Sequence, residues 1–285
     1  MGLSEKYGSW AFVAGGSEGL GGAWCDRLAA EGFNVVVSGR HIETIKAKSD
    51  ELKAKYNVET RELVVDLGGL DAYKEVIEKL SDLEIGFFVY NAGISDNRFF
   101  PERDIETELW RLNVNSRTLL ALSIYFSRQM VERKKGAMVL TSSGAGVCGS
   151  PYLQTYAATK AYNLNLAEGL WSELGDFGVD VISPIVGATI SQTLKVPAGT
   201  PGIQTAEEVV EETLEHLGKV PGFICSKIYD MFKENYVIDE RIRVIEHIKH
   251  EVHNPEVTDF FTKNDQASYV QKLMEKSLDE GTVKK

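Results

Sequence analysis

The chain has 285 residues, of which 43% are hydrophobic and 26% are charged, and its formal net charge is −11 at pH 7. This composition is that of a globular protein long enough to bury a core, and the acidic balance argues against nucleic acid or an anionic membrane surface as the main partner. No apolar stretch reaches the roughly 20 residues that a membrane helix needs, and the first residues lack a signal-peptide profile. We therefore expect a cytoplasmic protein without a membrane span.

Cysteine and histidine usage gives no sign of a metal site. Cys25, Cys148 and Cys225 form no CxxC pair, and we interpret them as reduced structural residues. The histidines show no HExxH spacing. The sequence therefore predicts neither a bound metal nor a catalytic thiol.

Apolar runs alternate with amphipathic segments along the first two thirds of the chain. The runs expected to form strands are 10–14, 34–38, 62–65, 85–90, 137–141 and 179–182. The segments expected to form the intervening helices are 23–32, 42–56, 71–81, 107–133 and 155–176. This alternation predicts an α/β fold, a single-domain doubly wound (Rossmann) parallel sheet with helices on both faces and ligands at the carboxyl ends of the strands.

The alternation stops after Pro184. The segment 187–204 contains several prolines and glycines, and we expect it to form a substrate loop on the ligand side of the sheet. A helix at 205–217, a short strand at 222–225 and charged helices to about residue 252 should follow. We expect one catalytic domain over 1–253 and a polar C-terminal tail over 254–285 that is not a separate domain.

A glycine-rich turn joins the first predicted strand to its helix. Its glycines let the backbone bend sharply and approach a pyrophosphate, while the helix N-terminus offers free N–H groups to the phosphates. The residues of this turn that we expect to bind a dinucleotide are Gly15, Ser17, Glu18, Gly19, Leu20 and Gly21.

The end of the second strand reads Ser38-Gly39-Arg40-His41. An acid at this place would hydrogen-bond the adenosine ribose of NAD, but none is present. The Arg40 guanidinium can instead bind a 2′-phosphate through two hydrogen bonds, so we expect NADP(H) rather than NAD(H) as the cofactor. The alternative for Arg40 is a solvated cation at the start of a helix.

Tyr156 and Lys160 lie four residues apart, downstream of Ser142 and Ser143. One turn of helix brings a phenol and an ammonium to the same face, where the cation lowers the pKa of the phenol. The spacing alone is common on amphipathic helices, and the surrounding motifs decide its meaning.

Together these motifs resemble those of the short-chain dehydrogenase/reductase family, from about residue 9 to 189 and more loosely to 252. The glycine turn matches TGxxxGxG with Ala14 in place of Thr, and Ser143 lies thirteen residues before a YxxxK motif. The family's NNAG motif has lost its first Asn, since Tyr90 stands there. The resemblance places further cofactor contacts at Asp66, Leu67, Asn91, Ala92, Gly93, Tyr156, Lys160 and Thr189.

Two family positions need interpretation. The helix Asn that anchors a water and the active-site lysine could be Asn113 or Asn115, and the VN pattern and the distance to Ser143 favour Asn115. The PG motif after the sixth strand reads Pro184-Ile185, so its glycine is absent, although Thr189 falls where a threonine contacts the nicotinamide carboxamide.

The resemblance and the chemistry together imply roles for four catalytic residues. Hydride transfer to a carbonyl carbon puts negative charge on the oxygen, which must be stabilised and protonated. Tyr156 would be the general acid in reduction and the base in oxidation, while Lys160 would hold the nicotinamide ribose and lower the pKa of Tyr156. Ser143, rather than Ser142, would donate a hydrogen bond to the carbonyl oxygen, and Asn115 would complete a proton path to solvent.

We expect an NADP-dependent alcohol dehydrogenase or carbonyl reductase for a small, hydrophobic ketone or secondary alcohol, such as a steroid or an aryl ketone. The alternatives are a 3-oxoacyl thioester reductase and a non-catalytic NADP-binding sensor or scaffold. The resemblance also implies a homodimer or homotetramer. Apolar residues that could line the substrate pocket are Phe99, Phe100, Val147, Tyr152, Ile190 and Leu194.

Overall fold

A computed structural model describes residues 2–190, 197, 200 and 202–252 of the chain. The chain divides into two compact units, Met1–Ile238 and Asp239–Lys285. The first unit holds the sheet, and helix α10 (Ile238–Val252) is what the structure describes of the second. The predicted tail at 254–285, Leu194 and much of the predicted loop at 187–204 lie outside the described residues.

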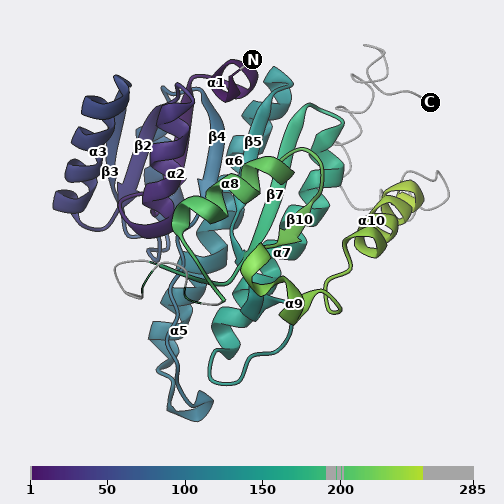
Figure 1. The fold of residues 1–285 in the computed structure, drawn as a ribbon. Helices are drawn as coiled ribbons and strands as arrows, with labels where there is room; N and C mark the ends of the chain where they lie inside the picture. The colour runs from purple at the N-terminus through teal and green to yellow at the C-terminus, as the bar shows by residue number, and fades with distance from the viewer. Residues whose placement is uncertain (1, 191–196, 198–199, 201, 253–285) are drawn as a thin grey trace. The chain divides into compact units, whose positions relative to one another are not determined.

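Seven parallel strands of the first unit form a sheet in the order β10-β7-β5-β4-β1-β2-β3 (Figure 1). They are β1 (Trp10–Ala14), β2 (Asn34–Gly39), β3 (Thr60–Val64), β4 (Ile85–Tyr90), β5 (Gly136–Leu140), β7 (Val179–Val186) and β10 (Gly222–Ile224). The short strand β6 (Ser142–Ser143) pairs with β7, and β8 (Ala188–Thr189) pairs with β9 (Ile203–Gln204). Strand order reverses between β1 and β4, the place where such sheets bind ligands.

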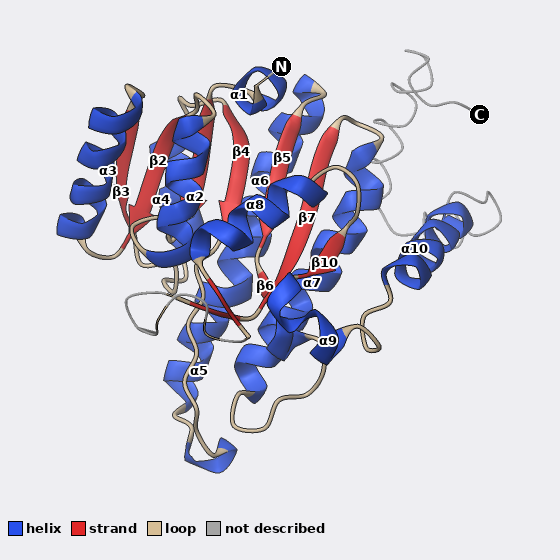
Figure 2. Ribbon diagram, in the orientation of Figure 1, coloured by secondary structure: helices blue, strands red, loops and turns tan. Residues whose placement is uncertain are grey.

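Helices cover both faces of the sheet, which confirms the predicted doubly wound fold (Figure 2). On one face lie α2 (Gly19–Ala30), α3 (Ile42–Tyr56) and α8 (Ala206–His216). On the other lie α4 (Ala72–Leu80), α6 (Thr118–Arg133) and α7 (Gln154–Gly175). Shorter helices are α1 (Leu3–Tyr7), α5 (Ile105–Leu112) and α9 (Tyr229–Phe232).

Alternate residues of the central strands pack into two apolar layers. Val35 and Val37 of β2 belong to a buried cluster that includes Trp24 of α2. On the opposite face Phe12 stacks on Phe88 with ring centres 5.6 Å apart, and Phe126 of α6 packs against both rings. Because both faces are covered, the strands carry unbroken apolar runs instead of alternating polarity.

One predicted helix is interrupted in the structure. The segment predicted as a single helix at 107–133 begins at Ile105, and the π-helix Asn113–Arg117 separates α5 from α6. A π-turn adds a residue to the helical repeat and turns the following side chains to a new face. The prediction of one continuous helix is therefore wrong, and the interruption falls on both candidate asparagines.

A second correction concerns Pro184. The predicted strand 179–182 extends to Val186, so the proline lies inside β7 and the alternation ends later than expected. Proline brings no N–H to a ladder. The neighbouring Ser183 hydroxyl donates to the Leu140 carbonyl at 2.7 Å and supplies a hydrogen bond to β5 beside that position.

The cysteines do not all fit the structural interpretation. Cys25 and Cys225 are buried, and burial raises the pKa of both thiols far above the ordinary value. Cys148 is free and exposed, so core packing does not explain it.

Candidate active site

Tyr156 and Lys160 lie in the first two turns of α7, and both line a small pocket of about 130 Å³ at the carboxyl end of the sheet. The Lys160 Nζ atom is 5.6 Å from the centre of the Tyr156 ring. The structure thus places a phenol and an ammonium together, as the helical spacing predicts.

Lys160 is 3% exposed, and its Nζ donates to the Thr141 carbonyl at 2.9 Å. Burial lowers the pKa of this ammonium from 10.5 to about 8. A desolvated cation with a carbonyl partner still has two N–H groups to offer, so this site can bind further acceptors such as ribose hydroxyls.

The phenol of Tyr156 is also largely buried, and its electrostatic environment is not the one expected from spacing. Burial raises the pKa of Tyr156, and a hydrogen bond with Ser143 partly opposes that rise. The pKa of Tyr156 is therefore raised overall. The lowering by Lys160 that the sequence predicts does not outweigh the effect of burial.

The two adjacent serines have different surroundings. Ser142 is buried, and its hydroxyl donates to the Lys160 carbonyl at 2.8 Å, which ties β6 to α7. Ser143 lines the pocket together with Tyr156, and its Oγ accepts from the N–H of Ala145 at 3.3 Å. Both serines line the pocket, but the Ser142 hydroxyl is taken up by the Lys160 carbonyl, so Ser143 is the serine whose hydroxyl proton remains available there.

The two candidate asparagines also separate. The Asn115 amide donates to the Ile94 carbonyl at 3.0 Å and to Thr159 Oγ1 at 3.2 Å, and its Oδ1 accepts the N–H of Ile94 at 2.9 Å. Asn113 instead donates to the Gly68 carbonyl at 3.0 Å. The structure places Asn115 against α7, one residue from Lys160, and Asn113 against the loop after β3.

The glycine turn forms a backbone cradle beside this pocket. Gly15 and Gly19 adopt left-handed φ angles of 75° and 55°, which favour glycine. A Cβ at Gly21 would lie 1.8 Å from the Gly15 carbonyl oxygen, and one at Gly15 would lie 3.1 Å from Ala92. The turn thus keeps backbone exposed at the start of α2, which fits the pyrophosphate of a dinucleotide.

The residues after β4 complete the wall next to that cradle. The N–H groups of Asn91 and Ala92 both donate to the Ala14 carbonyl, at 3.1 and 2.8 Å. A Cβ at Gly93 would lie 3.2 Å from Lys160 Nζ, so a side chain there would press on the ammonium. These contacts connect the glycine turn to the Tyr156 pocket.

The predicted adenosine contacts gather at the ends of β2 and β3. Arg40 is exposed, and a Cβ at the preceding Gly39 would lie 3.0 Å from Ser17 Oγ, so the Ser17 hydroxyl lies against the end of β2. Asp66 accepts a hydrogen bond from the indole of Trp110 at 3.1 Å. Leu67 is buried, and its carbonyl accepts from Thr118 Oγ1 at 2.7 Å. Sequence reasoning missed Trp110, because it comes from a helix 44 residues further on.

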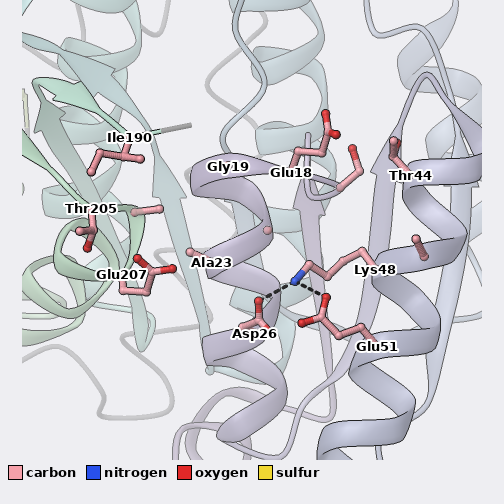
Figure 3. A pocket seen from close by; sticks show the side chains of 14 residues that line it. Glu18, Gly19, Ala23, Asp26, Thr44, Lys48, Glu51, Ile190, Thr205 and Glu207 are labelled. Atoms are coloured by element: carbon pink, nitrogen blue, oxygen red, sulfur yellow. Dashed lines mark hydrogen bonds and ion pairs between the residues drawn. The ribbon is translucent and has the colours of Figure 1, made fainter. Parts of the chain in front are cut away.

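A larger cleft of about 760 Å³ lies beyond the glycine turn, between α2, α3 and the start of α8 (Figure 3). Lys48 reaches across it to Asp26 and Glu51 at 2.6 and 2.9 Å. Glu18 and Ser17 line this cleft, whereas Leu20 lines the Tyr156 pocket. Among the described residues that line this cleft, the acids are Glu18, Asp26, Glu51 and Glu207, and the basic residue is Lys48.

Apolar side chains from the end of the first unit cover the backbone next to Ser143. A Cβ at Gly144 would lie 2.7 Å from Phe232, and one at Gly187 would lie 2.5 Å from Ile228. Val147 packs against the same cluster. Sequence reasoning found Val147 but missed Ile228 and Phe232, since nothing local relates them to the pocket.

The other predicted pocket residues are more scattered. Phe99, Phe100 and Tyr152 are more than half exposed, and Ile190 lines the larger cleft. Thr189 lies on β8, its hydroxyl donates to the Gly187 carbonyl at 3.2 Å, and it is not among the described residues that line the Tyr156 pocket.

A doubly wound sheet, a glycine cradle at its first helix and a Ser-Tyr-Lys set beside it define an oxidoreductase that uses a nicotinamide cofactor. The chain belongs to the short-chain dehydrogenase/reductase family. The family model described as short chain dehydrogenase matches residues 9–197.

The chain is similar to known proteins over most of its own length and over most of theirs. A 7β-hydroxysteroid dehydrogenase of Mediterraneibacter gnavus is 32% identical over 256 residues, which are 85% of this chain and 97% of that protein. A very-long-chain 3-oxoacyl-CoA reductase of Rattus norvegicus is 31% identical over 79% of this chain and 75% of its own length. A solved 7β-hydroxysteroid dehydrogenase structure has a TM-score of 0.78 and 31% identity, over 86% of this chain and 100% of that one.

None of the helices in the described part of the chain has the length and apolar character needed to cross a membrane.

Proposed function

We propose that the chain is an NADP(H)-dependent alcohol dehydrogenase or carbonyl reductase for a bulky apolar ketone or secondary alcohol, with a steroid as the leading substrate class. The observation that carries the reaction type is that Ser143, Tyr156 and the buried Lys160 line one small pocket. A hydrogen-bond donor and a proton donor that converge on one point suit a carbonyl oxygen.

The roles of the side chains follow from this geometry. The nicotinamide ring, when bound, supplies or accepts the hydride. Ser143 donates a hydrogen bond to the substrate oxygen, and Tyr156 gives its proton to that oxygen in reduction. Because burial raises the pKa of Tyr156, the phenol is protonated at neutral pH, the form that reduction requires. Lys160 stabilises the charge that remains on the phenol and holds the ribose hydroxyls.

Asn115 has a positioning role in this proposal. It holds the backbone of Ile94 and the hydroxyl of Thr159, so it fixes the segment after Gly93 against α7. In the π-helix around it, the Val114 carbonyl accepts a hydrogen bond from the Tyr90 hydroxyl at 2.6 Å. We infer that a proton path from Lys160 to solvent runs along this interruption.

The preference for NADP(H) rests on the end of β2. Arg40 stands there without an acid beside it in the sequence, and the Ser17 hydroxyl lies against Gly39. A guanidinium and a hydroxyl suit a 2′-phosphate, whereas a ribose diol would find no carboxylate acceptor. The ratio of kcat/KM for NADPH to that for NADH should therefore be well above one.

The steroid proposal rests on the apolar cover over Gly144 and Gly187. Ile228 and Phe232 put a hydrocarbon wall directly beside Ser143, where the reacting carbon must lie. The similarity to 7β-hydroxysteroid dehydrogenases over most of the chain supports the same class.

The test of the proposed reaction is Tyr156→Phe. We expect kcat for a ketosteroid to fall by at least about 100-fold because the proton donor is lost. The dissociation constant of NADPH, measured by fluorescence titration, should stay within about twofold because the ring remains. Tyr162→Phe, on an exposed part of the same helix, is the matched control and should keep full turnover. Unchanged turnover in Tyr156→Phe would sink the catalytic assignment and favour a non-catalytic NADP-binding sensor or scaffold.

A second candidate is reduction of 3-oxoacyl thioesters, which the similarity to very-long-chain 3-oxoacyl-CoA reductases favours. A panel of ketosteroids, aryl ketones and 3-oxoacyl thioesters, each run with NADPH and NADH, separates the two. The highest kcat/KM on a thioester would replace the steroid proposal and leave the chemistry of Tyr156 unchanged.

We also infer a cytoplasmic location, which the three free cysteines support, and a homodimer or homotetramer.

A further inference from the structure

Trp110 reaches from α5 to the loop that follows β3. Its indole Nε1 donates to Asp66 Oδ2 at 3.1 Å, and Asp66 Oδ1 accepts the N–H of Gly68 at 3.0 Å. Each carboxylate oxygen therefore has a fixed donor, and an exposed side chain that would otherwise rotate is held in one orientation.

The ring is packed against this loop and is not a loose surface group. A Cβ at Gly68 would lie 2.0 Å from Trp110 Nε1, so only glycine leaves room for the indole. Asn113, three residues along the same helical segment, donates to the Gly68 carbonyl at 3.0 Å. Residues three apart share a helix face, so Trp110 and Asn113 clamp one short loop together.

The same ring carries Arg40. The carbon of the Arg40 guanidinium is 5.7 Å from the centre of the Trp110 ring, within the range of a cation–π contact. Arg40 follows β2 and Asp66 follows β3, so one aromatic ring links the ends of two neighbouring strands. Both ends lie beside the glycine cradle, where the adenosine half of a dinucleotide extends from its pyrophosphate.

We propose that Trp110 is a positioning residue for the adenosine half of NADP(H), through two separate contacts. The indole N–H orients Asp66 as an acceptor for the exocyclic amino group of the purine. The face of the ring holds the Arg40 guanidinium in reach of the 2′-phosphate. The second contact rests on the proposed preference for NADP(H), whereas the first does not.

The two contacts can be separated with two substitutions and two fragment ligands. Adenosine 2′,5′-bisphosphate and 5′-AMP differ only in the 2′-phosphate, and isothermal titration of each against the full chain needs no turnover. Trp110→Phe removes the N–H and keeps a ring for Arg40. Both fragments should then bind about fivefold more weakly, and the ratio of their dissociation constants should not change.

Trp110→Leu removes both contacts. 5′-AMP should bind about as weakly as it binds Trp110→Phe, but the bisphosphate should lose a further factor of about five, so the preference for it falls. Glu106→Gln, at an exposed residue of α5, is the matched control and should leave both constants unchanged. Trp110→Phe keeps the test decisive if the leucine variant does not fold.

The outcomes also distinguish this inference from the proposed function. Arg40→Asp should abolish the preference for the bisphosphate. If it does not, NADP(H) selectivity itself is wrong. If Arg40→Asp abolishes the preference and Trp110→Leu leaves it intact, the link between Trp110 and Arg40 is overturned. Unchanged binding of 5′-AMP to Trp110→Phe overturns the role of Trp110 in holding Asp66.

Discussion

The Lys160 ammonium lies in buried surroundings that disfavour its positive charge. It is almost fully buried, with the Thr141 carbonyl as its hydrogen-bond partner. A pKa of about 8 against an ordinary value of 10.5 means that protonated Lys160 costs the folded protein about 3 kcal/mol at pH 7. The residue that we propose to hold the nicotinamide ribose thus lowers the stability of the folded protein.

Replacing Lys160 should therefore stabilise the free protein. At pH 7 Lys160→Met removes the buried charge but also a hydrogen bond, so we expect the free energy of unfolding to rise by about 1–3 kcal/mol. Urea unfolding measures this change, and the same variant should have no measurable turnover. Lys48→Met is the matched control: Lys48 pairs with Asp26 and Glu51, and that substitution should destabilise.

The pH dependence has a definite sign. Between pH 8 and 10.5 the unfolded chain holds the Lys160 proton more tightly than the folded protein, so the wild type gains stability as pH rises through this range. The advantage of Lys160→Met should shrink accordingly and be lost near pH 10.5. An advantage that is the same at pH 7 and pH 10 would show that packing, and not charge, is its cause.

At the scale of elements, a buried arginine joins three segments next to the start of α7. The side chain of Arg103 is 4% exposed, and it bonds Asp96 at 2.9 Å, Glu108 of α5 at 2.7 Å and the carbonyl of Tyr152 at 2.7 Å. Tyr152 has a left-handed φ of 64°, a conformation that costs a tyrosine energy and that these bonds hold in place. Glu108 also accepts from Thr155 at the start of α7.

We expect Arg103→Met to loosen this rim without touching the cofactor side. The free energy of unfolding should fall by about 3 kcal/mol, because two partly buried carboxylates lose a partner. KM for a ketone should rise, while the dissociation constant of NADPH should stay unchanged in fluorescence titration. Arg98→Met, at an exposed arginine 3.4 Å from Asp96, is the control and should change stability by less than about 0.5 kcal/mol. A matching loss of NADPH affinity would mean that the network supports the whole sheet edge.

The sequence predicts the elements that depend on local chemistry. Buried β-branched and aromatic runs predict β1, β2 and β4, and the four-residue spacing of Tyr156 and Lys160 correctly places both on one face of α7. Each of these patterns lies within a single strand or helix, so residues that are neighbours in the sequence are enough to predict the element.

What the sequence did not predict depends on contacts between distant segments. The π-helix at Asn113–Arg117 decides which asparagine faces α7, and the helical pattern on either side of it is continuous. Trp110 meets Asp66 across 44 residues, and Tyr7 of the unpredicted α1 bonds Asp180 across 173. No local propensity encodes such pairs, so only the assembled sheet reveals them.

At the scale of the whole molecule, helices α5 and α6 of the first unit each carry exposed apolar side chains. Large hydrophobic side chains along α5 and α6 are between 36% and 73% exposed, and their spacing of three or four residues within each helix gives each a continuous face. They are Ile105, Leu109, Leu112, Leu120 and Ile124. A stripe of this kind, which we call the α5–α6 stripe, marks an interaction site more often than free surface.

A second copy of the chain is the partner that this stripe suits, since a two-fold axis lays the same apolar face against itself. We expect a dimer, or a tetramer built on that dimer, in light scattering after size exclusion. Leu120→Glu combined with Ile124→Glu should give a monomer, because the carboxylates of one copy would face and repel those of the other. The circular dichroism spectrum should be unchanged, since both positions are exposed in the single chain. Met231→Glu changes a more exposed apolar residue outside the stripe and should leave the assembly intact. A monomeric wild type would show that the chain forms no such subunit contact. A double variant that still dimerises would show that the contact lies elsewhere.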